Sequence, residues 1–284
     1  MKLDFKRIPL IVIGGIFICL IIIVNISVID IGKTPIQKLC KGIDELVDND
    51  YNIIGEISIQ NKKDDILVTD DISFLYEGVI RNSDNRIKLS VVVKENTLGI
   101  EKELGDLYKI DDRIIIAPLV EKNSYYYNLP SKEVDKKLGI IKVEQILDYV
   151  HNNIDSEGNK PIIINSLGKK LMTNKISINI TSKDINEIII NEEEYKNINN
   201  NLFDTLRNEE YTININTYID KANYVKKIEL FIENNNFKIS SVNCIEEYNK
   251  VDKISIEDIL DNGLDIEDIE ERDILRIISK MFDM

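Results

Sequence analysis

The sequence predicts an α+β protein in which an N-terminal transmembrane helix is followed by a curved antiparallel β-sheet, an open half-barrel that covers helices. Three observations lead to this fold class. Residues 8–29 contain no charged side chain. Beyond them, apolar and polar residues alternate in many short runs separated by turn-forming residues, which is typical of antiparallel strands with one buried face. Helical spacing of apolar residues occurs in only a few segments between these runs.

The first element is the apolar segment 8–29. As a helix with about 1.5 Å rise per residue it reaches roughly 30 Å, the thickness of a bilayer's hydrocarbon core. Residues 1–7 include Lys2, Lys6 and Arg7, and a short basic terminus favours the cytoplasmic side. A cleaved signal peptide is the alternative, although the positions three before the candidate cleavage sites are Asn25 and Asp30, where a small residue is expected. We expect a single-pass cell-membrane protein whose larger part lies outside the cytoplasm.

The predicted extracytoplasmic domain spans residues 34–251. It begins with a helix over 35–49, whose apolar residues share one face. Alternation then predicts four to seven strands between Tyr51 and Leu129, one near 175–181 and three between 210 and 247. Short links at 82–85, 111–112 and 220–223 predict hairpins.

Helices are expected in the middle of this domain. Residues 142–152 carry apolar residues on one face, and Asp184 with Glu187 predicts a capping box that starts a second helix. Residues 161–171 suit either a strand or a helix. The helices are expected to form a layer across the buried face of one sheet.

The acidic extension 252–284 has 11 acidic and 4 basic residues. It is expected to be helical, with an apolar stripe that is a candidate partner-binding face: Ile274, Ile277, Ile278 and Met281. The alternative is a helix packed on the domain.

Few residues suggest chemistry. His151 is the single histidine, and no catalytic or metal-binding motif occurs around it. Residues 153–159 resemble the start of a calcium loop, but Ile164 occupies the twelfth position, where a bidentate Glu is required, so a solvated turn is expected. The net charge of -14 argues against nucleic-acid binding. We expect no enzyme activity, no cofactor and no metal. Whether Cys40 and Cys244 pair is left open.

Apolar strand residues and a tyrosine run are the candidate cavity or interface residues. Tyrosine suits a cavity mouth or a protein interface because its ring is apolar and its hydroxyl polar. The candidates are Tyr125, Tyr126, Tyr127, Ile213, Ile215, Ile228 and Leu230.

The order of elements resembles the LolA/LppX-like lipoprotein-carrier superfamily. The resemblance rests on the segments "YNIIGEISI", "FLYEGVI", "LYKIDDRIIIAPLVEKNSYYYNLP" and "YTININTYIDKANYVKKIELFI". It implies an open antiparallel sheet that wraps over helices, often around an apolar cavity for acyl chains. The group includes lipid carriers, stress-signalling sensors and a clostridial germination lipoprotein that activates a cortex-cleaving amidase. The composition, rich in Ile, Asn and Lys, is similar to that of proteins from Clostridium, a genus of Gram-positive bacteria.

Two functions follow as expectations. The first is a membrane-anchored, non-enzymatic binding or sensor protein of the bacterial envelope, linked to sporulation or germination, with an envelope protein as partner. The alternative is a lipid or lipoprotein carrier that uses an apolar cavity of the half-barrel.

Overall fold

The computed structural model describes a single large sheet with two helices. The described residues are 35–63, 66–67, 72–95, 100–110, 113–118, 127–130, 157–166, 168–191, 210–235 and 237–254. The predicted anchor 8–29, the predicted helix 142–152, His151 and the acidic extension from residue 255 onward lie outside them. Neither of the two helices described here combines the length and hydropathy needed to cross a bilayer.

The elements follow the order that alternation predicts. The first half contains α2 (Pro35–Asp48), β1 (Tyr51–Lys63), β2 (Ile66–Leu67), β3 (Ile72–Arg81), the short 3-10 helix η1 (Asn82–Asp84), β4 (Arg86–Glu95), β5 (Ile100–Ile110), β6 (Arg113–Pro118) and β7 (Tyr127–Pro130). The second half contains β8 (Glu157–Ser166), β9 (Lys169–Thr181), α5 (Ser182–Asn191), β10 (Thr212–Ile219), β11 (Val225–Glu233) and β12 (Phe237–Glu246).

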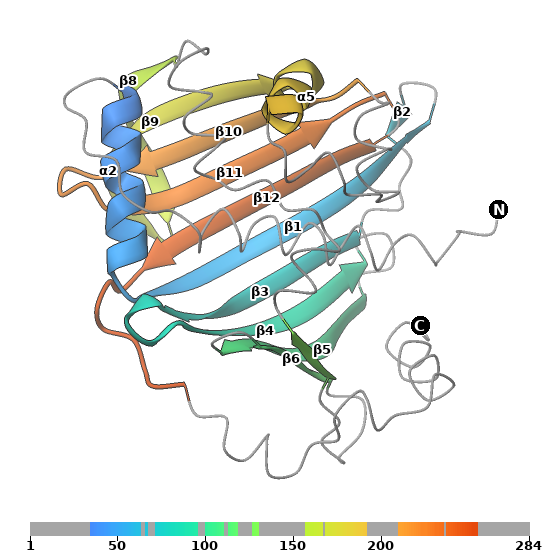
Figure 1. The fold of residues 1–284 in the computed structure, drawn as a ribbon, viewed down its shortest axis with the longest axis vertical. Helices are drawn as coiled ribbons and strands as arrows, with labels where there is room; N and C mark the ends of the chain where they lie inside the picture. The colour runs from blue at the N-terminus through green and yellow to red at the C-terminus, as the bar shows by residue number, and fades with distance from the viewer. Residues whose placement is uncertain are drawn as a thin grey trace.

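The strands form one antiparallel sheet in the order β7-β6-β5-β4-β3-β1-β12-β11-β10-β9-β8, with β2 paired to β1. The central pair therefore joins the first and last strands of the domain, and each half of the chain spreads outward from it as a meander (Figure 1). The predicted large open antiparallel sheet is confirmed. Of residues 161–171, which the sequence left open, 161–166 belong to β8 and 169–171 to β9.

The inner face of the sheet is the face on which α2 packs. Helix α2 lies across one end of β8–β11 (Figure 1), and its buried apolar residues join the main core: Ile36, Leu39, Ile43 and Leu46. Gly42 allows the close approach, because a Cβ there would lie 2.8 Å from Cδ1 of Ile219 and 3.2 Å from Cγ2 of Val225. The helix therefore seals the sheet at this end.

Helix α5 also contributes to the main core, through Ile185. Its capping box differs from the predicted pair Asp184–Glu187. Asp184 accepts hydrogen bonds from the Thr181 backbone N–H at 2.7 Å and hydroxyl at 2.6 Å, and its own N–H faces the Thr181 Oγ1 at 3.4 Å. The box lies three residues earlier because Thr181, the last residue of β9, is the residue that leaves the sheet and caps the helix.

The outer face is more polar and carries a second, smaller apolar cluster. Tyr108, Ile110 and Ile115 pack there with Ile254, where the chain leaves the sheet after β12. The two described cysteines are Cys40 and Cys244, and neither forms a disulfide. Cys40 packs against the main core, whereas Cys244 alternates with the inner residues of β12, so they lie on different faces and no disulfide joins them.

Candidate functional site

The candidate site is the apolar inner face at the end far from α2. The isoleucine row, defined as Ile180, Ile213, Ile232, Ile239 and Ile59, places five isoleucines side by side on five neighbouring strands. Ile213 and Ile219, at opposite ends of β10, are about 20 Å apart at roughly 3.3 Å per residue. The row therefore crosses the sheet at the end opposite the helix that seals it.

Accessibility is graded along the inner face. At the α2 end Ile219 and Val225 are fully buried, with 0% exposure. In the isoleucine row Ile180 is buried, whereas the other four side chains are only partly buried against the core. The apolar face is thus closed at one end and keeps accessible aliphatic surface at the other.

A buried polar contact crosses the centre of this face. Gly55 lies on β1 between β3 and β12, and a Cβ there would lie 2.5 Å from the Tyr76 hydroxyl oxygen. The Tyr76 ring therefore lies over Gly55, and its hydroxyl donates to Oδ1 of Asn243 on β12. Asn243 Nδ2 donates to Oγ of Ser241 at 3.0 Å. All three side chains are buried, so this contact fixes the two halves of the sheet against each other in a low-dielectric region.

A polar pocket of about 400 Å³ adjoins the open end of the face. It lies where β9 passes into α5 and where β10 begins and β11 ends, one residue beyond the isoleucine row. Lys183, Glu210 and Glu233 line it together with Tyr211, whose pKa burial raises to about 12. Thr181, Thr212 and Glu233, which also line the pocket, alternate with the isoleucines of the row, so pocket and row share a rim at the strand ends rather than one face.

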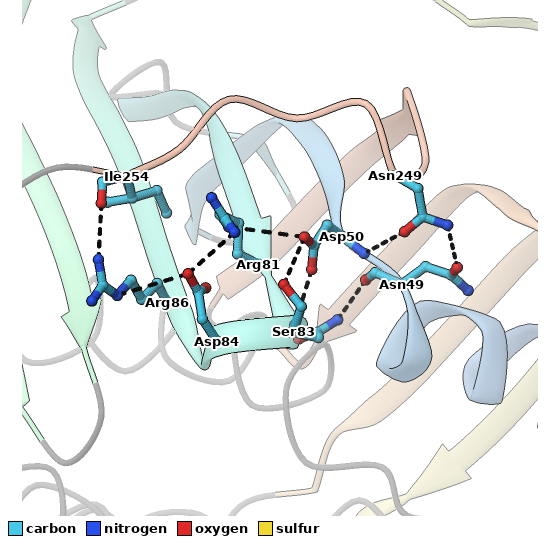
Figure 2. A network of polar contacts seen from close by, with 9 residues as sticks. Asn49, Asp50, Arg81, Ser83, Asp84, Arg86, Asn249 and Ile254 are labelled. Atoms are coloured by element: carbon cyan, nitrogen blue, oxygen red, sulfur yellow. Dashed lines mark hydrogen bonds and ion pairs between the residues drawn. The ribbon is translucent and has the colours of Figure 1, made fainter.

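A polar clasp, defined as Asn49, Asp50, Arg81, Ser83, Asp84, Arg86 and Asn249, holds the α2 end of the sheet (Figure 2). Asp50 accepts hydrogen bonds from the Ser83 N–H at 2.9 Å and hydroxyl at 2.8 Å. Arg81 lies 3.2 Å from Asp84, and Arg86 donates to the backbone oxygen of Ile254 at 3.1 Å. Since Asn249 Nδ2 donates to Asn49 Oδ1 at 2.6 Å, the clasp joins the beginning and the end of the described domain.

Two polar clusters lie on the outer face. On β10 and β11, Tyr218 donates to Glu229 at 2.8 Å and Lys227 lies 2.6 Å from the same carboxylate. Partial burial raises the pKa of Glu229, but the hydrogen bonds from Lys227 and Tyr218 outweigh it, so the net shift is downward. On β5, Tyr108 donates to Asp106 at 2.9 Å, and Ser90 of β4 donates to the same carboxylate at 2.6 Å. Each acid is held by its neighbours, which favours a structural role.

The structure places the sequence-predicted candidates in different regions. Ile213, Ile215, Ile228 and Leu230 share the inner face, with Ile215 directly opposite Leu230 and Ile213 in the isoleucine row. Tyr127 begins β7, at the far edge of the sheet, while Tyr125 and Tyr126 lie outside the described residues. The stripe Ile274, Ile277, Ile278 and Met281 also lies outside them. The polar pocket and the contact between Tyr76 and Asn243 were not predicted.

In the described parts of the chain, no group of three or more His, Cys, Asp or Glu side chains has the arrangement of a metal site.

Fold and site together define an open antiparallel sheet domain with an apolar inner face. Among solved structures, the chain is similar to the Mycobacterium tuberculosis lipoprotein LppX, with 12% identity and a TM-score of 0.44 over 78% of this chain and 98% of that one. It is also similar to a LolA superfamily protein from Nitrosomonas europaea, with 6% identity and a TM-score of 0.26 over 78% of this chain and 96% of that one.

The resemblance predicted from the sequence is thus found again in the names of these two neighbours, which assigns neither a family nor a function to this chain. No family model matches the chain, and no curated protein does. Resemblance to the clostridial germination lipoprotein stays a prediction.

Proposed function

We propose that this protein is a non-enzymatic lipid-binding protein that accommodates an acyl chain of a lipid or lipoprotein on the inner face of its sheet. The observation that carries the proposal is the graded apolar face, sealed by α2 at one end and partly accessible at the isoleucine row. Each methylene group moved from water onto such a surface contributes about 0.8 kcal/mol when it is fully buried.

The polar pocket supports an amphipathic ligand. A chain lying along the isoleucine row would bring its polar end to the rim where Lys183, Glu210 and Glu233 line the pocket. Because apolar and polar parts of the ligand would meet matching surfaces, binding would also fix the ligand's direction.

The anchored sensor expected from the sequence is the weaker of the two functions. Its candidate partner helix belongs to the acidic extension, which lies outside the described residues, whereas the inner face gives the lipid-binding alternative a surface. We retain the extracytoplasmic location and the anchor at 8–29 as part of the proposal. An anchored domain would take its ligand from, or present it at, one membrane.

Photocrosslinking of the full-length chain tests the proposal. The chain is reconstituted into vesicles that contain a phospholipid with a diazirine on one acyl chain, illuminated, and its crosslinked peptides are mapped by mass spectrometry. We expect crosslinks at inner-face residues of β10, β11 and β12. The predicted anchor serves as an internal positive control, so crosslinks confined to residues 8–29 would contradict the proposal.

Two adjacent residues of β11 provide a matched pair of variants. Ile232 lies in the isoleucine row and Phe231 points to the outer face, where its register partner is Ser240, and both side chains are partly buried. Ile232→Asn should lower crosslinking on the inner face severalfold, because it places an amide where the chain lies. Phe231→Asn should leave it unchanged. Equal effects of the two variants would show that the crosslinks do not report binding on the inner face.

A further inference from the structure

The β8–β9 hairpin concentrates exposed aliphatic side chains. Large hydrophobic residues are exposed at four described positions, and three of them lie on this hairpin: Ile162 at 41%, Ile163 at 63% and Met172 at 56%. Ile163 and Met172 are directly opposite each other on the two strands. Ile162 points to the other side, so apolar groups project from both faces of the hairpin.

The same segment is basic in an otherwise acidic chain. Residues 158–183 contain five lysines and no acidic residue, although the whole chain has a net charge of -14. At the turn, Lys169 has 72% of its side chain exposed and lies 3.8 Å from Glu246. Lys170 is also exposed and shares a face of the hairpin with Ile163 and Met172. We call Ile162, Ile163, Lys169, Lys170 and Met172 the hairpin surface.

Strand pairing with another chain is disfavoured at this edge. β8 is the last strand in the sheet order, and its outer edge would otherwise be a template for a further strand. Pro161 has no N–H to offer, and the register shifts between Gly158 and Lys160. A proline and an irregularity of this kind are the devices by which natural sheets protect an edge.

A bilayer fits the hairpin surface better than a folded partner does. A protein partner would need a cleft that encloses both faces of the hairpin, since Ile162 and Ile163 point in opposite directions. The headgroup region of a bilayer adapts to any such shape, and anionic lipids attract lysines beside inserted apolar groups.

We propose that the hairpin surface docks on a membrane that contains anionic lipid, with Ile163 and Met172 entering the interface and Lys169 and Lys170 contacting headgroups. This inference does not depend on a ligand being bound on the inner face. The hairpin at the edge of the sheet would then orient the domain on the bilayer.

The absence of tryptophan in the chain provides a clean test. Met172→Trp introduces the only indole of the full-length protein, which is reconstituted into vesicles of phosphatidylcholine alone or mixed with phosphatidylglycerol. We expect emission at shorter wavelength in the mixed vesicles and quenching by lipids with brominated acyl chains. Ile163→Trp repeats the measurement from the facing strand if the first variant folds poorly. Ile54→Trp is the matched control, because Ile54 is 39% exposed on the outer face opposite Glu77.

Charge reversal at the turn tests the contribution of the lysines. Lys169→Glu and Lys170→Glu in the Met172→Trp background should each lower the ratio of membrane-docked to undocked hairpin, measured by quenching of the indole, about fivefold or more. Quenching equal to that of the Ile54→Trp control would overturn the proposal, as would quenching that is the same without phosphatidylglycerol. A shift to shorter wavelength without lipid quenching, growing with the protein-to-lipid ratio, would overturn it in favour of contact between two copies of the chain.

Discussion

The variant Gly55→Ala tests whether the contact across the centre of the inner face holds the sheet together. A Cβ at this position would lie 2.5 Å from the Tyr76 hydroxyl oxygen, so the ring must move away from Asn243. Because the ring is buried in the core, it has little room to move.

The expected loss of stability has three parts. Leaving the buried Asn243 amide without its donor costs about 1–3 kcal/mol, and displacing the ring within a packed core costs about 1–3 kcal/mol. Alanine restricts the unfolded chain, which offsets about 0.4–1 kcal/mol. Taking the midpoint of each range, we expect Gly55→Ala to lower the free energy of unfolding by about 3 kcal/mol.

Urea unfolding followed by circular dichroism measures this loss in a double-mutant cycle. Tyr76→Val removes the ring, so Gly55→Ala in that background should cost less than about 0.5 kcal/mol. Glu56→Ala, exposed on the outer face of the same strand, is the control and should change stability by no more than about 0.5 kcal/mol. The reasoning is refuted if Gly55→Ala is as stable as the parent, or if its cost persists without the ring.

Two further predictions concern the clasp and the outer face. Asp50→Ala removes the acceptor of both Ser83 hydrogen bonds and should lower the free energy of unfolding by about 2 kcal/mol, whereas Asp48→Ala, exposed on α2, should have almost no effect in the same urea titration. Burial raises the pKa of Glu229, but the hydrogen bonds from Lys227 and Tyr218 outweigh it, so the pKa is lower in the folded than in the unfolded state. Its contribution is therefore complete above the unfolded-state pKa and is lost as the pH falls through the folded-state pKa. Thermal unfolding from pH 6 downward should therefore show a smaller loss for Glu229→Gln than for the parent, and equal losses would contradict this account.

Sequence pattern predicts the faces of strands more readily than it predicts which residues meet across them. Alternation is local, so it already placed Ile213 and Ile215 with Ile228 and Leu230 on common faces. The alignment of Ile213 with Ile232, and of Ile232 with Ile239, depends on the register between strands, which local alternation does not specify.

Two other features, the β8–β9 hairpin and Gly55, were not recognised from the sequence. The run Ile162–Ile164 has no alternation, because apolar groups project from both faces of the β8–β9 hairpin. Without alternation, the sequence could not distinguish a strand from a helix in this segment. Gly55 was a usable signal that sequence reasoning missed. A glycine at an inner-face position between Ile53 and Ile57 indicates that another group approaches the backbone closely.

The topology explains why the centre of the face contains a polar contact. Tyr76 and Asn243 are 167 residues apart in the chain, yet they meet across the strand pair that joins the two halves of the domain. A slip of one residue between β1 and β12 would turn Asn243 to the outer face and leave the Tyr76 hydroxyl without its acceptor. The same slip would turn Ile239 and Ile245 out of the core, so the alternation of β12 already disfavours it, and loss of the buried hydrogen bond adds to that cost. The contact thus reinforces the alignment that brings Ile239 into line with Ile232 and Ile59, on which the continuity of the isoleucine row depends.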